Sequence, residues 1–118
     1  MEQSNVMWGN AANASQETRG WFMGHFMPGE ANPLRTEDVE LKWFTHAKGE
    51  TRHEWAPGNP VRTLNILING RFVLLFPEQE VELKNQGDFV LFGPDVPHSY
   101  RSEEESLVLT VRWPSIRP

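Results

Sequence analysis

Hydrophobic and polar positions alternate in short runs along the chain after Gly20. Residues 21–27 and 39–46 show this alternation, and residues 107–113 place four large apolar side chains at every second position before Pro114. A period of two puts successive side chains on opposite faces of an extended strand. Short strands separated by turn residues are typical of an all-β sandwich or barrel.

Three further runs are apolar at nearly every position, namely residues 64–68, 72–76 and 89–92. An antiparallel strand with one face in water would alternate instead. We therefore expect one face of these strands to fill the interior of a barrel and the other face to meet a second sheet. In so small a domain that second sheet is expected to come from another copy of the chain, which predicts a homodimer.

Turn residues divide these runs. Asn69-Gly70 separates residues 64–68 from residues 71–76 and predicts a tight hairpin, because both turn residues tolerate the positive φ of a type I′ turn. Residues 77–79 and 85–88 predict further turns. No window of helical length carries an apolar repeat, so the pattern predicts strands and turns alone.

Composition sets the size and the class of the protein. Residues 1–19 are rich in Asn, Ser, Ala and Gln and predict a flexible N-terminal tail, so that residues 20–118 form a single domain. The net charge of −5 comes with no basic stripe that could neutralise phosphates, which argues against a nucleic-acid partner. The chain has no cysteine, which excludes disulfides, thiolate metal sites and thiol nucleophiles.

The same sequence gives no sign of export or of a membrane. No apolar run follows a basic start at the N-terminus, and no stretch approaches the length of a membrane span. We therefore expect a cytoplasmic protein without a membrane partner.

The most informative pattern surrounds a single histidine. Gly87-Asp88 forms a turn before an apolar strand, Gly93-Pro94 interrupts the chain, and Pro97 precedes His98. This layout resembles the second motif of the cupin superfamily. The resemblance implies an antiparallel cupin-type β-barrel, a jelly roll or double-stranded β-helix, with His98 facing its interior. Tyr100, two residues further on, should point to the same side in a regular strand.

The first cupin motif supplies two histidines and a glutamate to a metal, and here its positions have changed. The place of the glutamate falls on Thr63, and Trp55 takes the place of the second histidine. His53 becomes a ligand if residues 56–60 form a bulging loop. The resemblance then implies a reduced site for a divalent ion such as Fe, Mn, Ni or Zn. Its ligands would be His53 and His98, completed by His46 or Glu50.

Two functional hypotheses follow. In the first, the barrel binds a polar or aromatic small molecule without a full metal site, and His98 serves as an acid or base if a reaction occurs. The residues expected to line that pocket are Trp55, Thr63, Asn65 and Tyr100. In the second, the protein is a metal-dependent enzyme, oxygenase-like or isomerase-like, that uses the reduced histidine site. A purely structural dimer with a filled interior is the third alternative.

Overall fold

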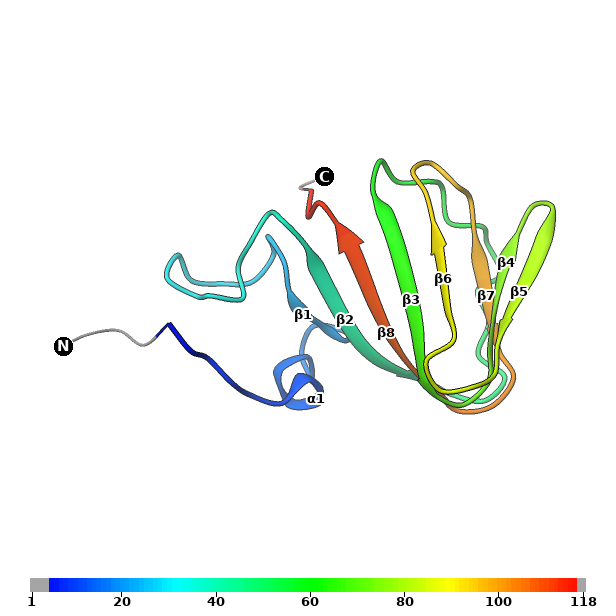
Figure 1. The fold of residues 1–118 in the computed structure, drawn as a ribbon, viewed down its shortest axis with the longest axis horizontal. Helices are drawn as coiled ribbons and strands as arrows, with labels where there is room; N and C mark the ends of the chain where they lie inside the picture. Colours follow the sequence, from blue (N-terminus) through cyan, green and yellow to red (C-terminus); the bar gives the residue numbers. More distant parts are fainter. Residues whose placement is uncertain (1–4, 117–118) are drawn as a thin grey trace.

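The structure is a computed structural model, and it describes residues 5–116 as two antiparallel sheets that face each other (Figure 1). One sheet has five strands in the order β1-β2-β8-β3-β6, and the other has three in the order β5-β4-β7. The prediction of an all-β protein is therefore confirmed. The elements are α1 (Ala11–Ala14), β1 (Trp21–Met23), β2 (Glu40–His46), β3 (Arg62–Asn69), β4 (Phe72–Phe76), β5 (Gln79–Leu83), β6 (Phe89–Phe92), β7 (Ser99–Ser102) and β8 (Ser106–Trp113).

The register of the five-stranded sheet sorts polar and apolar residues onto its two faces. Lys42 of β2 lies opposite Thr110 of β8, and Thr110 lies opposite Asn65 of β3. Since neighbouring residues alternate between faces, the next row, with Val111 opposite Leu64, points the other way. The polar row faces the three-stranded sheet, so this end of the interior is polar and the outer face is apolar.

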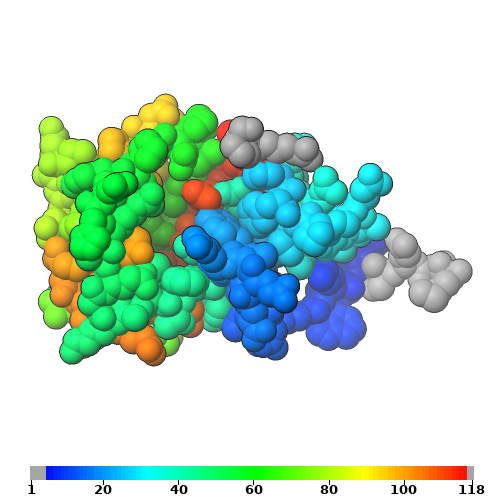
Figure 2. All heavy atoms as spheres, turned by 180° about the vertical axis from the view of Figure 1, so that it is seen from behind, coloured from blue at the N-terminus to red at the C-terminus, as the bar shows by residue number. Residues whose placement is uncertain are grey.

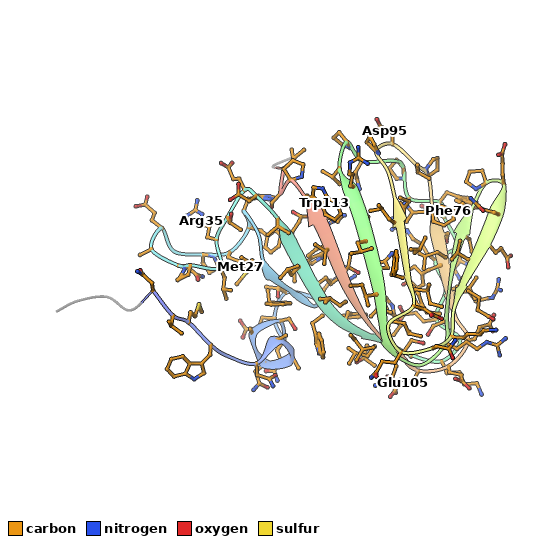
Figure 3. The ribbon with its side chains drawn as sticks, viewed as in Figure 1. Met27, Arg35, Phe76, Asp95, Glu105 and Trp113 are labelled. Carbon is orange, nitrogen blue, oxygen red and sulfur yellow. The ribbon has the colours of Figure 1, made fainter. Side chains whose placement is uncertain are left out.

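The hydrophobic core lies between the two sheets. Leu67 of β3 and Val108 of β8 pack against Phe72 and Leu74 of β4 and Leu83 of β5, and all five side chains are buried. Burying a side chain of this size contributes about 1.5–3 kcal/mol to folding. The core holds the sheets together. The polar rows lie between the core and the end of the sheets marked by Asp95 and Trp113, and Glu105 marks the other end (Figure 3).

The outer face of the five-stranded sheet is apolar across β2, β8, β3 and β6. At its edge Phe89 and Leu91 are 65% and 51% exposed. The three-stranded sheet packs against the inner face, so within residues 5–116 no second sheet covers the outer one. The apolar side chains of this outer face include Leu41, Trp43, Leu64, Ile66, Phe89, Leu91, Leu107, Leu109 and Val111, and Arg62 and Thr45 lie at its ends.

The hairpin predicted at Asn69-Gly70 is wrong. β3 pairs with β6 and β8, whereas β4 pairs with β5 and β7, so the chain passes from one sheet to the other at this point. Gly70 has φ +106°, but Asn69 does not have the positive φ of a type I′ turn. A Cβ on Gly70 would lie 2.4 Å from the Glu105 carbonyl and 2.5 Å from Ser106. The glycine is required by this close crossing.

The N-terminal region also departs from expectation. Within the tail predicted for residues 1–19, α1 forms with Asn10 as its N-cap, and Ser15 is only 5% exposed. Residues 1–4 lie outside the described part of the chain. The strand predicted over residues 21–27 ends at Met23 because the chain turns at Gly24. No helix among residues 5–116 is long and apolar enough to cross a membrane.

The loop between β2 and β3, residues 47–61, lies against the chain that leads into β7. Ala56 and His98 exchange two backbone hydrogen bonds of 2.8 and 3.2 Å. A Cβ on Gly58 would lie within 2.6 Å of the backbone of Asp95, so the loop is closely packed there. In the view from behind, this green segment lies beside the orange residues near 100 (Figure 2). We refer to residues 47–61 as the rim loop.

Candidate functional site

A pocket of about 140 Å³ lies between the two sheets. β2, β3 and β8 supply polar side chains from the inner rows of the large sheet, and β4 and β7 close it from the other side. At about 30 Å³ for one water, the volume equals roughly four or five water molecules. The polar side chains that line it are Lys42, His46, Arg52, Thr63, Asn65, His98, Tyr100, Thr110 and Arg112.

His98 enters this interior pocket from the residue before β7. Its Nδ1 lies 3.1 Å from the Val96 carbonyl oxygen, which can only accept, so Nδ1 carries the proton of the neutral ring. The ring packs against Phe92 with centroids 4.7 Å apart. Burial lowers the pKa of His98 below 6.5. At neutral pH the ring is uncharged, and its Nε2 is left as a hydrogen-bond acceptor and a weak base.

His46, Glu50 and Tyr100 form a hydrogen-bonded group beside the pocket. The His46 Nδ1 lies 2.5 Å from Glu50 Oε2, and the Tyr100 hydroxyl donates to the same oxygen over 2.8 Å. Burial lowers the pKa of His46, and it raises the pKa of Tyr100 to about 12 with the help of Glu50. Burial alone would raise the pKa of Glu50. The hydrogen bonds with His46 and Tyr100 have the larger effect, so the pKa of Glu50 is lowered.

Thr63 and Asn65 present donors from β3. Both residues are 7% exposed. The Asn65 Oδ1 accepts a hydrogen bond of 2.8 Å from the Thr110 hydroxyl, so its amide nitrogen is the group left over. No other side-chain hydrogen bond within residues 5–116 uses Thr63 or Asn65. A polar molecule in the pocket could satisfy both groups.

Three cationic side chains line the same space. Arg112 pairs with Glu40 over 2.7 Å, and the other Glu40 oxygen accepts from Ser115 over 2.8 Å. The Lys42 Nζ lies 5.6 Å from the centre of the Trp21 ring. Burial, and then the charge of Arg112, lowers the pKa of Lys42. Arg52, from the rim loop, is exposed and therefore stands at the mouth of the pocket.

The structure brings together most of the residues that the sequence singled out. Thr63, Asn65, Tyr100 and His98 all line the pocket, whereas Trp55 does not and is 48% exposed on the rim loop. His53 is exposed on the same loop and does not line the pocket either. Sequence analysis missed the three cationic residues that line it. They are Lys42, Arg52 and Arg112.

The residues present do not fit the metal site that the sequence resemblance implied. Within residues 5–116, no three His, Asp or Glu side chains are placed to hold a metal ion. The expected completing ligands, His46 and Glu50, bind each other, and Glu50 also binds Tyr100. The pocket around His98 carries cationic side chains, which repel a divalent ion. The set of His53, His98 and a third donor is therefore not assembled in this structure.

A second, larger concavity lies between β5 and β6. Its volume is about 550 Å³, and its walls are mostly apolar. Phe76 and Val81 lie on one side, Val90 and Phe92 on the other, and Asp95 and Glu78 lie at its border. Phe92 lines both this groove and the interior pocket. The groove offers apolar surface, whereas His46, His98 and three cationic side chains gather in the interior pocket.

Comparison with solved structures identifies the fold. A cupin superfamily protein from Desulfitobacterium hafniense superposes with a TM-score of 0.61 and 19% identity, over 67% of this chain and 70% of that one. This chain has the cupin fold. KdgF from Halomonas sp. superposes with a TM-score of 0.60 and 18% identity, over 67% of this chain and 71% of that one.

Another match extends over nearly the whole chain. A conserved Streptococcus pyogenes protein of unknown function superposes with a TM-score of 0.63 and 13% identity, over 97% of this chain and 95% of that one. No protein-family model and no curated protein matches the sequence. At these identities the likeness shows the cupin fold, and the chemistry has to be argued from the residues of this chain.

Proposed function

We propose that this cupin-fold protein binds a polar small molecule in its interior pocket without a full metal site. One observation carries the proposal. The pocket contains polar groups that the protein leaves without partners, the Thr63 hydroxyl and the Asn65 amide nitrogen, next to the neutral ring of His98. Both residues line the pocket, so a ligand that supplies acceptors could take a hydrogen bond from each of them. We place the protein in the cytoplasm, as its composition predicts.

A thermal-shift screen of small polar molecules tests this binding. A ligand that binds only the folded protein raises the melting temperature, by an amount that grows with its concentration. We expect Asn65→Leu to remove the shift, because it deletes a pocket donor and keeps the side-chain size. Arg62→Gln is the matched control, since Arg62 is exposed on the same strand and does not line the pocket. Equal shifts in wild type and Asn65→Leu would contradict the proposal.

Metal analysis separates this proposal from a metal-dependent enzyme. We expect untagged protein to carry Fe, Mn, Ni and Zn well below one ion per chain, because the donors are not assembled. Stoichiometric metal that disappears in His98→Ala would instead favour the metal enzyme.

A proton-transfer reaction without metal is a second candidate function, and the geometry of His98 favours it. The Val96 carbonyl fixes the proton on Nδ1, so Nε2 can accept a proton from a bound molecule. Such a base works above its own pKa, and burial lowers the pKa of His98. For a ligand found in the screen, we expect His98→Gln to keep binding and to abolish exchange of a carbon-bound acidic proton of the ligand with deuterium. Exchange that persists in this variant would rule out His98 as the base.

We also propose that a second copy of the chain covers the apolar outer face. The face spans four strands about 4.8 Å apart and about 20 Å long, so its projected area is on the order of 400 Å². The largest apolar patch on a typical monomer is about 300–600 Å², and a patch of this size is often an interaction site. Two such faces can stack about a twofold axis as in a β-sandwich. Light scattering of the wild type should give twice the mass of one chain. The Leu91→Glu variant should give the mass of one chain, because it places a charge in the contact. A wild type with the mass of one chain would refute the dimer.

A further inference from the structure

The interior pocket carries an imbalance of charge. Its lining includes Lys42, Arg52 and Arg112 but no Asp or Glu side chain from the described part of the chain. Glu40, behind Arg112, neutralises one of the three cations. Glu50, which hydrogen-bonds the lining residues His46 and Tyr100, supplies a second negative charge beside the pocket. One positive charge is left unbalanced.

Two of the lining cations, Lys42 and Arg52, lack an ion pair within residues 5–116, and Lys42 is the less exposed of them. Its ammonium lies over the rings of Trp21 and Phe44, at 5.6 and 4.9 Å from their centres, and no ion pair within residues 5–116 includes it. Aromatic faces supply part of the stabilisation that a buried ammonium needs, but less than an anion does. Lys42 is half-buried, and lysines withdrawn from water are normally paired. An anion bound in the pocket would therefore stabilise the charged ammonium of Lys42.

Arg112 presents a second unmet group at the same place. Its guanidinium lies 4.3 Å from the centre of the Trp21 ring, and Glu40 takes one of its terminal nitrogens. The Nε is buried, and among residues 5–116 it is the one buried side-chain nitrogen or oxygen that has no hydrogen-bond partner. An N–H of a guanidinium is a strong donor toward a carboxylate oxygen.

The neutral donors lie in the same rows of the sheet. Thr63 is opposite Arg112, and Asn65 is opposite Thr110, which is itself opposite Lys42. Directly opposed residues have Cβ atoms about 5 Å apart, so these groups can reach one small ligand together. Apolar side chains line the rest of the space, among them Phe72 and Phe92. The pocket thus combines a donor-rich wall with an apolar wall.

We propose that the interior pocket binds a small monocarboxylate, with the carboxylate on Lys42, Arg112, Thr63 and Asn65 and the apolar body against Phe72 and Phe92. This inference rests on the proposed function and adds the class of the ligand. A single negative charge matches the single unbalanced positive charge. The volume of about 140 Å³ encloses a molecule of about five non-hydrogen atoms. A longer acid would extend past Arg52 at the mouth.

Calorimetric titration with matched pairs of compounds tests this class. The probes are sodium acetate, propionate and butyrate, their uncharged amides, and inorganic phosphate, all at constant ionic strength with chloride. We expect at least one carboxylate to bind and its amide to bind at least about tenfold more weakly, because the amide cannot satisfy a cation. Phosphate that binds more tightly than every carboxylate would overturn the monocarboxylate assignment.

Variants locate the site. Lys42→Met keeps the length and the apolar stem of the side chain, and we expect it to weaken carboxylate binding about 10–100-fold. Arg62→Met is the control, because it removes an exposed cation that does not line the pocket. Unchanged binding in Lys42→Met would refute the inference. Should that variant fail to fold, Thr63→Val gives a second test, with an expected loss of several-fold.

The outcomes distinguish this inference from the proposed function. Amides that bind as well as the acids, and lose binding in Asn65→Leu, would refute the anion assignment and leave a polar-ligand pocket in place. Carboxylate binding that survives both Lys42→Met and Asn65→Leu would refute both, because the ligand would then lie outside the pocket.

Discussion

The ionisation of Tyr100 gives the sharpest test of the interior geometry, because it is the only tyrosine in the chain. Burial, and then the hydrogen bond to Glu50, raises its pKa to about 12. The phenolate absorbs at longer wavelength than the phenol, and tryptophan does not titrate in this range. A pH titration followed by absorbance therefore reports this one hydroxyl. We expect the folded protein to show a midpoint near 12 and the urea-unfolded protein one near 10.

The magnitude follows from the size of the shift. A shift of about two pKa units corresponds to about 2.7 kcal/mol. Tyr100 is only partly buried, so solvent screening reduces this to about 1–1.5 kcal/mol. The sign is that of a group whose folded-state pKa is raised. The contribution is complete below pH 10, and it is lost as the pH rises from about 10 to about 12, where only the unfolded chain ionises.

Two variants separate the causes. Glu50→Gln removes the negative charge and keeps the shape, so the midpoint of Tyr100 should fall below 12 but stay above 10, because burial remains. Tyr100→Phe should show no transition at all, and its free energy of unfolding should fall by about 1–2 kcal/mol through the lost hydrogen bond. A midpoint near 10 in the folded wild type, checked by circular dichroism at the same pH, would refute the placement of this hydroxyl.

Two further predictions concern stability. Burial lowers the pKa of His46 and of His98, so the unfolded chain takes up protons before the folded protein as the pH falls. The melting temperature should therefore decline from pH 7 to pH 5. His98→Gln should make that decline shallower, because it removes one of the two imidazoles. A flat profile would contradict the buried imidazoles. Gly70→Ala should cost about 2–3 kcal/mol in urea unfolding, because its Cβ meets backbone, whereas Gly87→Ala, with φ +91° in open space, should cost about 1 kcal/mol. Equal costs would contradict the close crossing at Gly70.

The strands were predictable where the alternation was strong. The expected run over residues 107–113 became β8, and that over residues 39–46 became β2, each within one residue of its ends. β5 was not predicted, because its Val81 and Leu83 stand between charged residues in a run of only five. The partner of each strand was less accessible to sequence reasoning. Asn69-Gly70 has the composition of a hairpin turn. In the structure the glycine instead allows the chain to pass from one sheet to the other close to Glu105 and Ser106. The residues themselves do not indicate this contact.

The candidate site was predictable in its neutral residues and not in its cations. Thr63, Asn65 and Tyr100 were assigned to the interior from the motif and the period of two, and the structure places all three in the pocket. Lys42 and Arg112 alternate with large apolar residues, which is ordinarily the pattern of a strand with its charged face in water. Here the charged face points inward and the apolar face outward. The sequence contains this alternation but does not say which face is the interior.

The backbone pairing between the rim loop and the residue before β7 lets loop changes alter which ligands this protein binds. Because Ala56 and His98 share backbone hydrogen bonds, the imidazole is anchored to an exposed segment rather than to the sheets alone. Loops tolerate insertions and replacements far better than the strands they connect. A change of length in the exposed residues 51–55 would therefore tilt the ring and reshape the mouth while the sheets keep their packing, so ligand specificity can change separately from folding.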